Sequence, residues 1–279
     1  MKKIIAVGLL SVMAMFGLAG CGNAPERAPA DGKNQTAATG TLRFTANGED
    51  FVRRGLEAKD GWRLTFEHVY VSLNNVTAYQ ADPPFDPDRD AMVKARLKVE
   101  DVADKTVDLA EGDENAPPIL VAKVADIAAG YYNALSWDML RAVDGPAAGY
   151  SLVLIGQAVK GDRTVKFTIK DENQYGYTGG DYVGDERKGI VTPGGSADLE
   201  MTFHLDHLFG DAALPADDGL NRSAAGFEPF ALLADGDTVN VDMAAMREKM
   251  TALDFASVQS AVAGLGHVGE AHCRVEVKE

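Results

Sequence analysis

The chain has 279 residues, of which 25% are charged, and its formal net charge is −15 at pH 7. Loss of the two lysines of the N-terminal segment described next would bring this charge to about −17 (−15 − 2). So acidic a protein disfavours nucleic acids, heparin-like polymers and anionic membrane surfaces as partners, and is compatible with cations.

The N-terminus has the pattern of a bacterial lipoprotein signal. A short basic start precedes an apolar run over Ile4–Leu18, which ends in the tetrapeptide Leu18-Ala19-Gly20-Cys21. This order is typical of a secretory signal that is cleaved before a cysteine, and the run is shorter than the roughly 20 apolar residues of a membrane span. We predict a signal peptide over residues 1–20, lipidation of Cys21, and a lipid anchor that holds the protein in the bacterial cell envelope, facing the periplasm or on the outer membrane.

Residues 21–41 predict a flexible tether. They are rich in Gly, Ala, Pro, Asn and Thr, carry mixed charges and show no apolar periodicity, so they cannot form a core. The remaining residues, 42–279, are sufficient for one large domain.

The first half of this domain predicts β-strands. Over Trp62–Ala78 the apolar positions are even-numbered up to Tyr70 and odd-numbered from Val69 to Leu73. This pattern indicates either a strand that becomes buried on both faces or a β-bulge after Glu67. Further strands are predicted at Thr41–Phe44, Lys94–Val99, Lys105–Leu109, Ile119–Val124, Tyr131–Leu140, Tyr150–Lys160, Arg163–Lys170 and Ala197–Leu205. Their spacing and their Gly, Pro and Asp turns predict a mainly β fold, an antiparallel β-sandwich.

A helical segment is predicted late in the chain, at about 242–263. Met243, Met246 and Met250 follow one another at helical spacing, and the pattern continues to Val262. Although methionines can bind soft metals, such a stripe is typical of core packing. We therefore expect a small helical C-terminal extension of the sandwich.

The five histidines occur in three short segments, and each has a carboxylate within three residues. Imidazole is the commonest side-chain ligand of zinc and copper, and a neighbouring carboxylate can bind the ion or orient the ring. The candidate metal ligands are His204, His207, His267, His272, His68, Glu67, Asp206, Glu270 and Cys273.

Strand and turn geometry predicts which of these candidate ligands lie near one another. On a continuous strand His204 and Asp206 point to the same face and His207 to the other. If the strand ends at Asp206, a turn can bring His207 back beside His204. The glycines near His267 and His272 give that segment the freedom to wrap around an ion.

Two candidates have alternative interpretations. His68 shares its strand face with Phe66 and Tyr70, so it could equally be a core histidine. Because Cys21 carries lipid, Cys273 has no partner for an intrachain disulfide. A lone exported thiol is buried, paired between molecules or bound to metal. Its position next to His272 favours a place in or beside the metal site.

Three segments resemble a known pattern: Val69–Leu73, Thr106–Leu109 and Ala129–Leu135. They are similar to strands of exported β-sandwich lipoproteins of the copper-binding MbnP-like periplasmic family and its uncharacterised relatives. The resemblance covers roughly residues 41–170. It implies an exported, metal-handling sandwich and assigns no ligand residue, because the histidine segments near 204 and 267 lie outside it.

Together these patterns predict an envelope lipoprotein that binds zinc, or as second choice copper, for capture, buffering or delivery, with a metal transporter or envelope protein as a possible partner. Enzymatic activity is less favoured, since the chain contains no GxSxG elbow, phosphate-binding glycine loop, HExxH or paired CxxC. The alternatives are an adhesion or envelope-assembly module that displays loops to a protein partner, and a metal-dependent hydrolase.

The lipidation prediction can be tested with Cys21→Ser. Without a thiol at the cleavage site the precursor cannot be lipidated, so we expect the variant to leave the detergent phase on phase partitioning, where the wild type stays. A variant that still fractionates with membranes after complete signal cleavage would show that the lipoprotein assignment is wrong.

Overall fold

The computed structural model describes residues 38–101, 104–184 and 187–278, and the protein is mainly β, as predicted. The predicted signal peptide, Cys21 and most of the predicted tether lie outside these residues. Strand β1 begins at Thr39, which pairs with Ala128 of β6, so the last residues assigned to the tether belong to a sheet. Within the described ranges, no helix is both long enough and apolar enough to cross a membrane.

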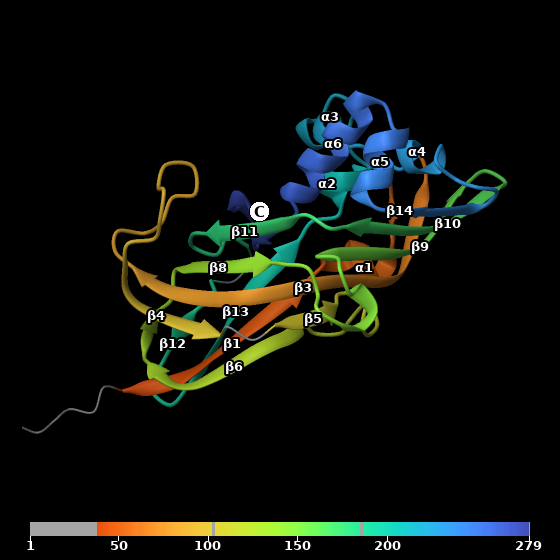
Figure 1. Cartoon of the computed structure of the whole chain (residues 1–279). Coiled ribbons are helices and arrows are strands. Elements are labelled where there is room, and N and C mark those ends of the chain that lie inside the picture. The colour runs from red at the N-terminus through yellow and green to blue at the C-terminus, as the bar shows by residue number, and fades with distance from the viewer. Residues whose placement is uncertain (1–37, 102–103, 185–186, 279) are drawn as a thin grey trace, which may run out of the picture. The chain divides into compact units, whose positions relative to one another are not determined.

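The described strands form three sheets (Figure 1). The five-stranded sheet has the order β16 (Ala271–His272), β15 (Gly266–Val268), β13 (Ser196–Phe203), β1 (Thr39–Asn47) and β6 (Ile119–Ala128). The main path of the ten-stranded sheet is β14 (Thr238–Val241), β10 (Arg163–Asp171), β9 (Leu152–Lys160), β3 (Arg63–Ala81), β8 (Ala134–Met139), β11 (Gln174–Gly179) and β17 (Arg274–Lys278). Strands β2 (Leu56–Glu57), β4 (Ala95–Asp101) and β5 (Lys105–Asp108) also pair with β3, and β7 (Gly130–Tyr131) pairs with β12 (Ile190–Val191).

The long strand β3 organises the larger sheet. Its register with β9 shifts between Phe66 and His68, which confirms the predicted bulge at Glu67. Before the bulge Leu64 is fully buried, and after it Val69 is fully buried, so the buried face moves from even to odd positions. The bulge thereby turns His68 away from the core.

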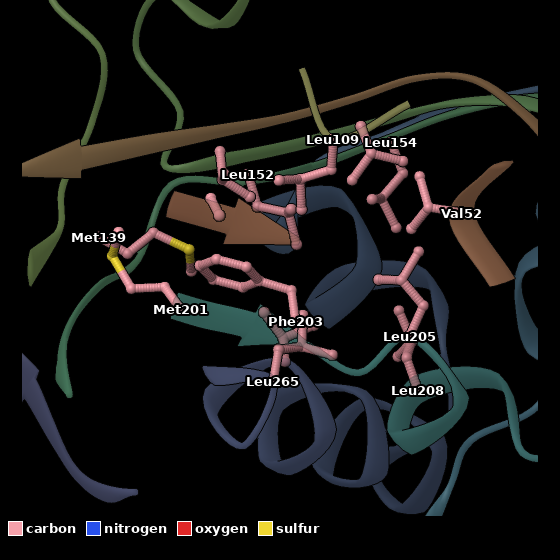
Figure 2. Close-up of a cluster of buried hydrophobic side chains, with 14 of the residues drawn as sticks. Val52, Leu109, Met139, Leu152, Leu154, Met201, Phe203, Leu205, Leu208 and Leu265 are labelled. Carbon is pink, nitrogen blue, oxygen red and sulfur yellow. The ribbon is translucent and has the colours of Figure 1, made fainter. Parts of the chain in front are cut away.

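One apolar core joins the two large sheets and the helices. Figure 2 shows part of it, with Phe203 of β13 lying among leucines and methionines from several elements. Phe203 is 1% exposed. Leu205, between His204 and His207, and Leu265, just before His267, are equally well buried. The segments that carry the histidines are therefore anchored by apolar neighbours.

Two strand pairs differ from the predicted antiparallel arrangement. Strand β1 pairs in parallel with β13, and β10 pairs in parallel with β14. Parallel neighbours need a long connection, and residues 48–195 and 172–237 provide one in each case. The strand periodicity does not encode this choice, since an alternating strand fits either pairing.

Six α-helices occur in the described residues: α1 (Glu49–Arg54), α2 (Asp206–Phe209), α3 (Gly219–Ser223), α4 (Glu228–Ala231), α5 (Met243–Lys249) and α6 (Ala252–Ala263); a 3-10 turn spans Gly145–Ala147. Helices α2 to α6 gather at one side of the sheets (Figure 1). Met243 and Met246 are buried in the core, as their spacing predicts. The helices are not a C-terminal extension, because α6 is followed by β15, β16 and β17, which complete both large sheets.

We expect Phe203→Ala to lower the free energy of unfolding by about 3–5 kcal/mol, because it leaves a cavity in the core next to the histidines. Leu253→Ala, at a side chain that is 77% exposed in α6, should change it by less than about 0.5 kcal/mol. Urea denaturation followed by circular dichroism measures both. Equal effects of the two substitutions would contradict this account of the core.

Candidate metal centre

Four of the five histidines lie together just beyond the end of β13. His204 follows this strand directly, and the His207 N–H donates to the His204 carbonyl oxygen at 3.2 Å, so the chain turns at once into α2. The predicted turn therefore exists, although the strand ends at Phe203 rather than at Asp206. It brings His207 back to the side of His204.

The other two histidines come from the hairpin of β15 and β16. His267 is the register partner of His272 across this hairpin and of Thr202 in β13. Gly269, at a φ of 58°, allows the tight turn between the two short strands. The pairing of β13 with β15 and of β15 with β16 thus brings the histidines at the end of β13, in β15 and in β16 to one place.

Three of the four rings offer nitrogens close enough to share an ion, and the fourth ring, that of His272, lies beside them but outside this group. Their centroids are 4.2 Å apart for His204 and His267, 4.5 Å for His267 and His272, and 4.8 Å for His207 and His267. One nitrogen each from His204, His207 and His267 lies within 4.8 Å of the other two. Two nitrogens on one zinc ion are at most about 4.2 Å apart, twice a bond of about 2.1 Å. Small side-chain rotations would therefore bring the three nitrogens onto one ion.

The hydrogen bonding of the buried rings fits a metal ligand. His267 is 2% exposed, and neither of its ring nitrogens has a hydrogen-bond partner. His204 is 4% exposed, and its Nε2 lies 3.1 Å from the Gly269 carbonyl oxygen. A buried polar atom without a partner costs about 1–3 kcal/mol. A metal ion on His267 would provide the partner that the protein itself lacks.

Burial and the neighbouring histidines lower the pKa values of two of these imidazoles, those of His267 and His207. Burial, followed by the neighbouring histidines, lowers the pKa of His267 to about 2. The same two causes lower the pKa of His207 from 6.5 to about 4. Metal ions bind the neutral ring, so at neutral pH His207 and His267 can coordinate without first losing a proton.

Three carboxylates surround the cluster. Asp206 begins α2, its Oδ1 is buried without a partner, and burial raises its pKa above the ordinary value. Glu270 lies in the turn of the hairpin and is exposed. Glu49 places its Oε1 3.4 Å from His204 Nε2, and together with Glu270 and His204 it forms a second group of potential ligands.

Sequence reasoning did not find Glu49. This residue lies just beyond β1, and it reaches the histidines because Asn47 in β1 is the parallel partner of Thr202. Its φ of 58° is unusual for a residue with a side chain. No spacing or motif marks it, because the parallel pairing of β1 with β13 is what brings it to the site.

The structure does not bring His68 and Glu67 to this cluster. His68 Nδ1 lies 2.7 Å from Asp108 Oδ2, its ring stacks on Tyr70, and its side chain is 45% exposed. It is therefore not a core histidine either. Glu67 is exposed at the bulge. The bulge explains both positions, because it shifts this part of β3 outward.

Cys273 also lies outside the two potential ligand groups of the described residues. Ala271 and His272 alternate between the faces of β16, so Cys273 lies on the face opposite His272. Its Sγ comes close to Gly179 and packs against the apolar core. Burial raises the pKa of the thiol far above its ordinary value. Metals bind the thiolate, which this environment disfavours.

Comparison with known proteins adds no assignment. No protein-family model, curated protein or solved structure matches the chain. The resemblance to MbnP-like proteins thus stays a prediction, and the case for a function depends on the geometry of the site.

The lowered pKa of His207 predicts a pH dependence of stability in the metal-free protein. Between pH 6.5 and about 4 the unfolded chain takes up a proton at this residue and the folded chain does not, so acid destabilises the fold. His207→Asn should flatten the fall in unfolding free energy over this window by up to about 1.4 kcal/mol per pH unit, the slope for one proton. Urea unfolding with chelator at several pH values measures it.

The wild type must be compared with the His207→Asn variant, because Asp171 changes the free energy of unfolding with pH in the opposite direction. Burial raises the pKa of this carboxyl to about 6, so the folded state gains stability from Asp171 as the pH falls below that value. This contribution is common to wild type and variant and cancels in their difference. Parallel stability curves for the two proteins would contradict the prediction.

Proposed function

We propose that the protein is an exported, lipid-anchored lipoprotein of the bacterial envelope that binds zinc, or as second choice copper, for capture, buffering or delivery. The observation that carries this proposal is the environment of His267. This imidazole is nearly inaccessible, and neither of its nitrogens has a hydrogen-bond partner. Its ring lies against those of the three other clustered histidines. A histidine kept only for packing would satisfy at least one nitrogen with a hydrogen bond.

The ion would be held by His204, His207, His267 and His272. Four nitrogen ligands suit the tetrahedral coordination of zinc, and imidazole also suits copper. A closed set of four protein ligands is typical of binding and structural sites, since catalytic zinc keeps one position open. This favours capture or delivery over the hydrolase alternative. The site is reached from the side of His272, whose side chain is exposed.

The core, the net charge and the predicted tether also support the proposal of a metal-binding envelope lipoprotein. The two large sheets share one apolar core, which supports a β-sandwich in the proposed domain. The net charge of −15 favours the approach of cations. A tether between a lipid anchor and the domain would leave the site free to meet a metal transporter or another envelope protein.

We expect zinc to stabilise the full chain, purified in detergent, against heat. At a free zinc concentration 100-fold above Kd, binding to the folded state adds about 2.7 kcal/mol, which raises the melting temperature of a domain of this size by roughly 5–10 °C relative to chelator. His207→Ala with His272→Ala should abolish most of this shift, because it removes two ligands at the more accessible positions. Calorimetry with zinc and with copper measures the effect.

His68→Ala is the matched control for this pair, because it removes a histidine that lies outside the cluster, and it should keep the full shift. Elemental analysis gives the metal content independently. Less than about a tenth of an equivalent of zinc or copper bound at micromolar concentration would contradict the proposal and favour the envelope-assembly alternative.

A further inference from the structure

A separate cavity lies beside Glu49 and Glu270. It has a volume of about 510 Å³ and opens between β1, α1 and the turn of the β15–β16 hairpin. Its walls include the carboxylates Glu49, Asp50, Glu200 and Glu270. None of the four clustered histidines lines it, so this cavity is distinct from the inner histidine cluster.

Two carboxylates of the cavity wall come close to His204, which itself lies behind the wall. Carboxylate oxygens of Glu49 and Glu270 and a nitrogen of His204 all lie within 4.8 Å of one another. Glu49 Oε1 is 3.4 Å from His204 Nε2, and the Gly269 carbonyl oxygen is 3.1 Å from the same nitrogen. These separations match those of neighbouring ligands around one divalent cation with bonds of about 2.1 Å.

The negative charge at this point is at most partly balanced by the protein, because His204 is the cationic partner of Glu49 only when its ring is protonated. Glu49 experiences the negative charges of Glu270, Asp206 and Asp50 as well as its interaction with His204. Among the carboxylates of the cavity wall, Glu200 is neutralised by Lys188 at 2.9 Å, and Asp50 pairs with Arg54. Within the described residues, neither Glu49 nor Glu270 forms an ion pair with a lysine or arginine. A bound cation would supply the missing positive charge.

A buried hydroxyl provides an independent observation. Thr202 is 2% exposed, lines the cavity, and its Oγ1 has no hydrogen-bond partner. Because a threonine hydroxyl ordinarily finds a backbone partner, an unsatisfied one at the wall of an acidic cavity indicates a ligand there. A cation or the water molecules around it would use this oxygen.

We propose that Glu49, Glu270 and His204 form a second cation site, distinct from the four-histidine cluster, which binds an oxygen-preferring divalent cation such as Mn²⁺. Two carboxylates with a carbonyl and a hydroxyl nearby favour Mn²⁺, Mg²⁺ or Ca²⁺, whereas clustered imidazoles favour zinc and copper. The inference goes beyond the proposed function, because the outer site does not need His207, His267 or His272.

Electron paramagnetic resonance of Mn²⁺ tests this site, because the six-line signal of the free ion disappears on binding. We expect the full chain in detergent to bind about one equivalent, and Glu49→Gln with Glu270→Gln to weaken binding at least about tenfold, since both charged oxygens are lost. Asp50→Asn is the matched control, because it removes a carboxylate of the same cavity that lies outside the ligand group, and it should bind Mn²⁺ with less than a threefold change.

The zinc-site variant separates this inference from the proposed function. His207→Ala with His272→Ala should keep Mn²⁺ binding, whatever it does to zinc. If that variant loses Mn²⁺ while the Glu49 and Glu270 variant keeps it, the ion binds at the histidine cluster and the inference is wrong. Absence of bound Mn²⁺ at millimolar concentration would also overturn it. Melting curves of the metal-free variants show that each is folded.

Discussion

The antiparallel pairing of β13 with β15 is the interaction on which the histidine cluster depends. It sets Thr202 opposite His267, while the short hairpin beyond it sets His267 opposite His272. Because side chains alternate along a strand, a slip of one residue would turn His267 to the opposite face. The apolar neighbours Phe203 and Leu265, both buried, oppose such a slip, since it would expose them.

The cluster combines a rigid apolar support with poorly satisfied polar groups. Each fully buried aliphatic or aromatic side chain around it contributes about 1.5–3 kcal/mol to the stability of the fold. These contributions offset the cost of removing the imidazoles of His204 and His267 from water without full hydrogen bonding. The protein thereby holds the imidazole nitrogens close together in a place where they would otherwise be unfavourable. Such local strain in the polar network is typical of functional sites rather than of packing.

His204 connects two chemically different surroundings. On one side it contacts the rings of His207 and His267, and on the other its Nε2 approaches Glu49. Nitrogen donors lie toward the core and oxygen donors toward the acidic cavity. If both proposed sites bind ions, the nitrogen ligands favour soft and borderline ions and the oxygen ligands favour hard ions. The parallel pairing of β1 with β13 creates this division, because it alone brings Glu49 to His204.

Local patterns in the sequence determined the mainly β class, most strand positions, the bulge at Glu67 and the burial of the methionine stripe. They also identified the histidines that meet in space, because pairs such as His204 and His207 lie close in the chain. Each of these features depends on a periodicity or spacing of a few residues, which the sequence displays directly.

Only the tertiary structure decided the parallel pairings, the insertion of the helices between strands, the inclusion of Glu49, and the positions of His68 and Cys273 away from the cluster. These features depend on which distant strands become neighbours and which face each turns inward. An alternating strand fits several partners equally well, and the choice follows from burying the whole core at once. That collective constraint is absent from any single segment.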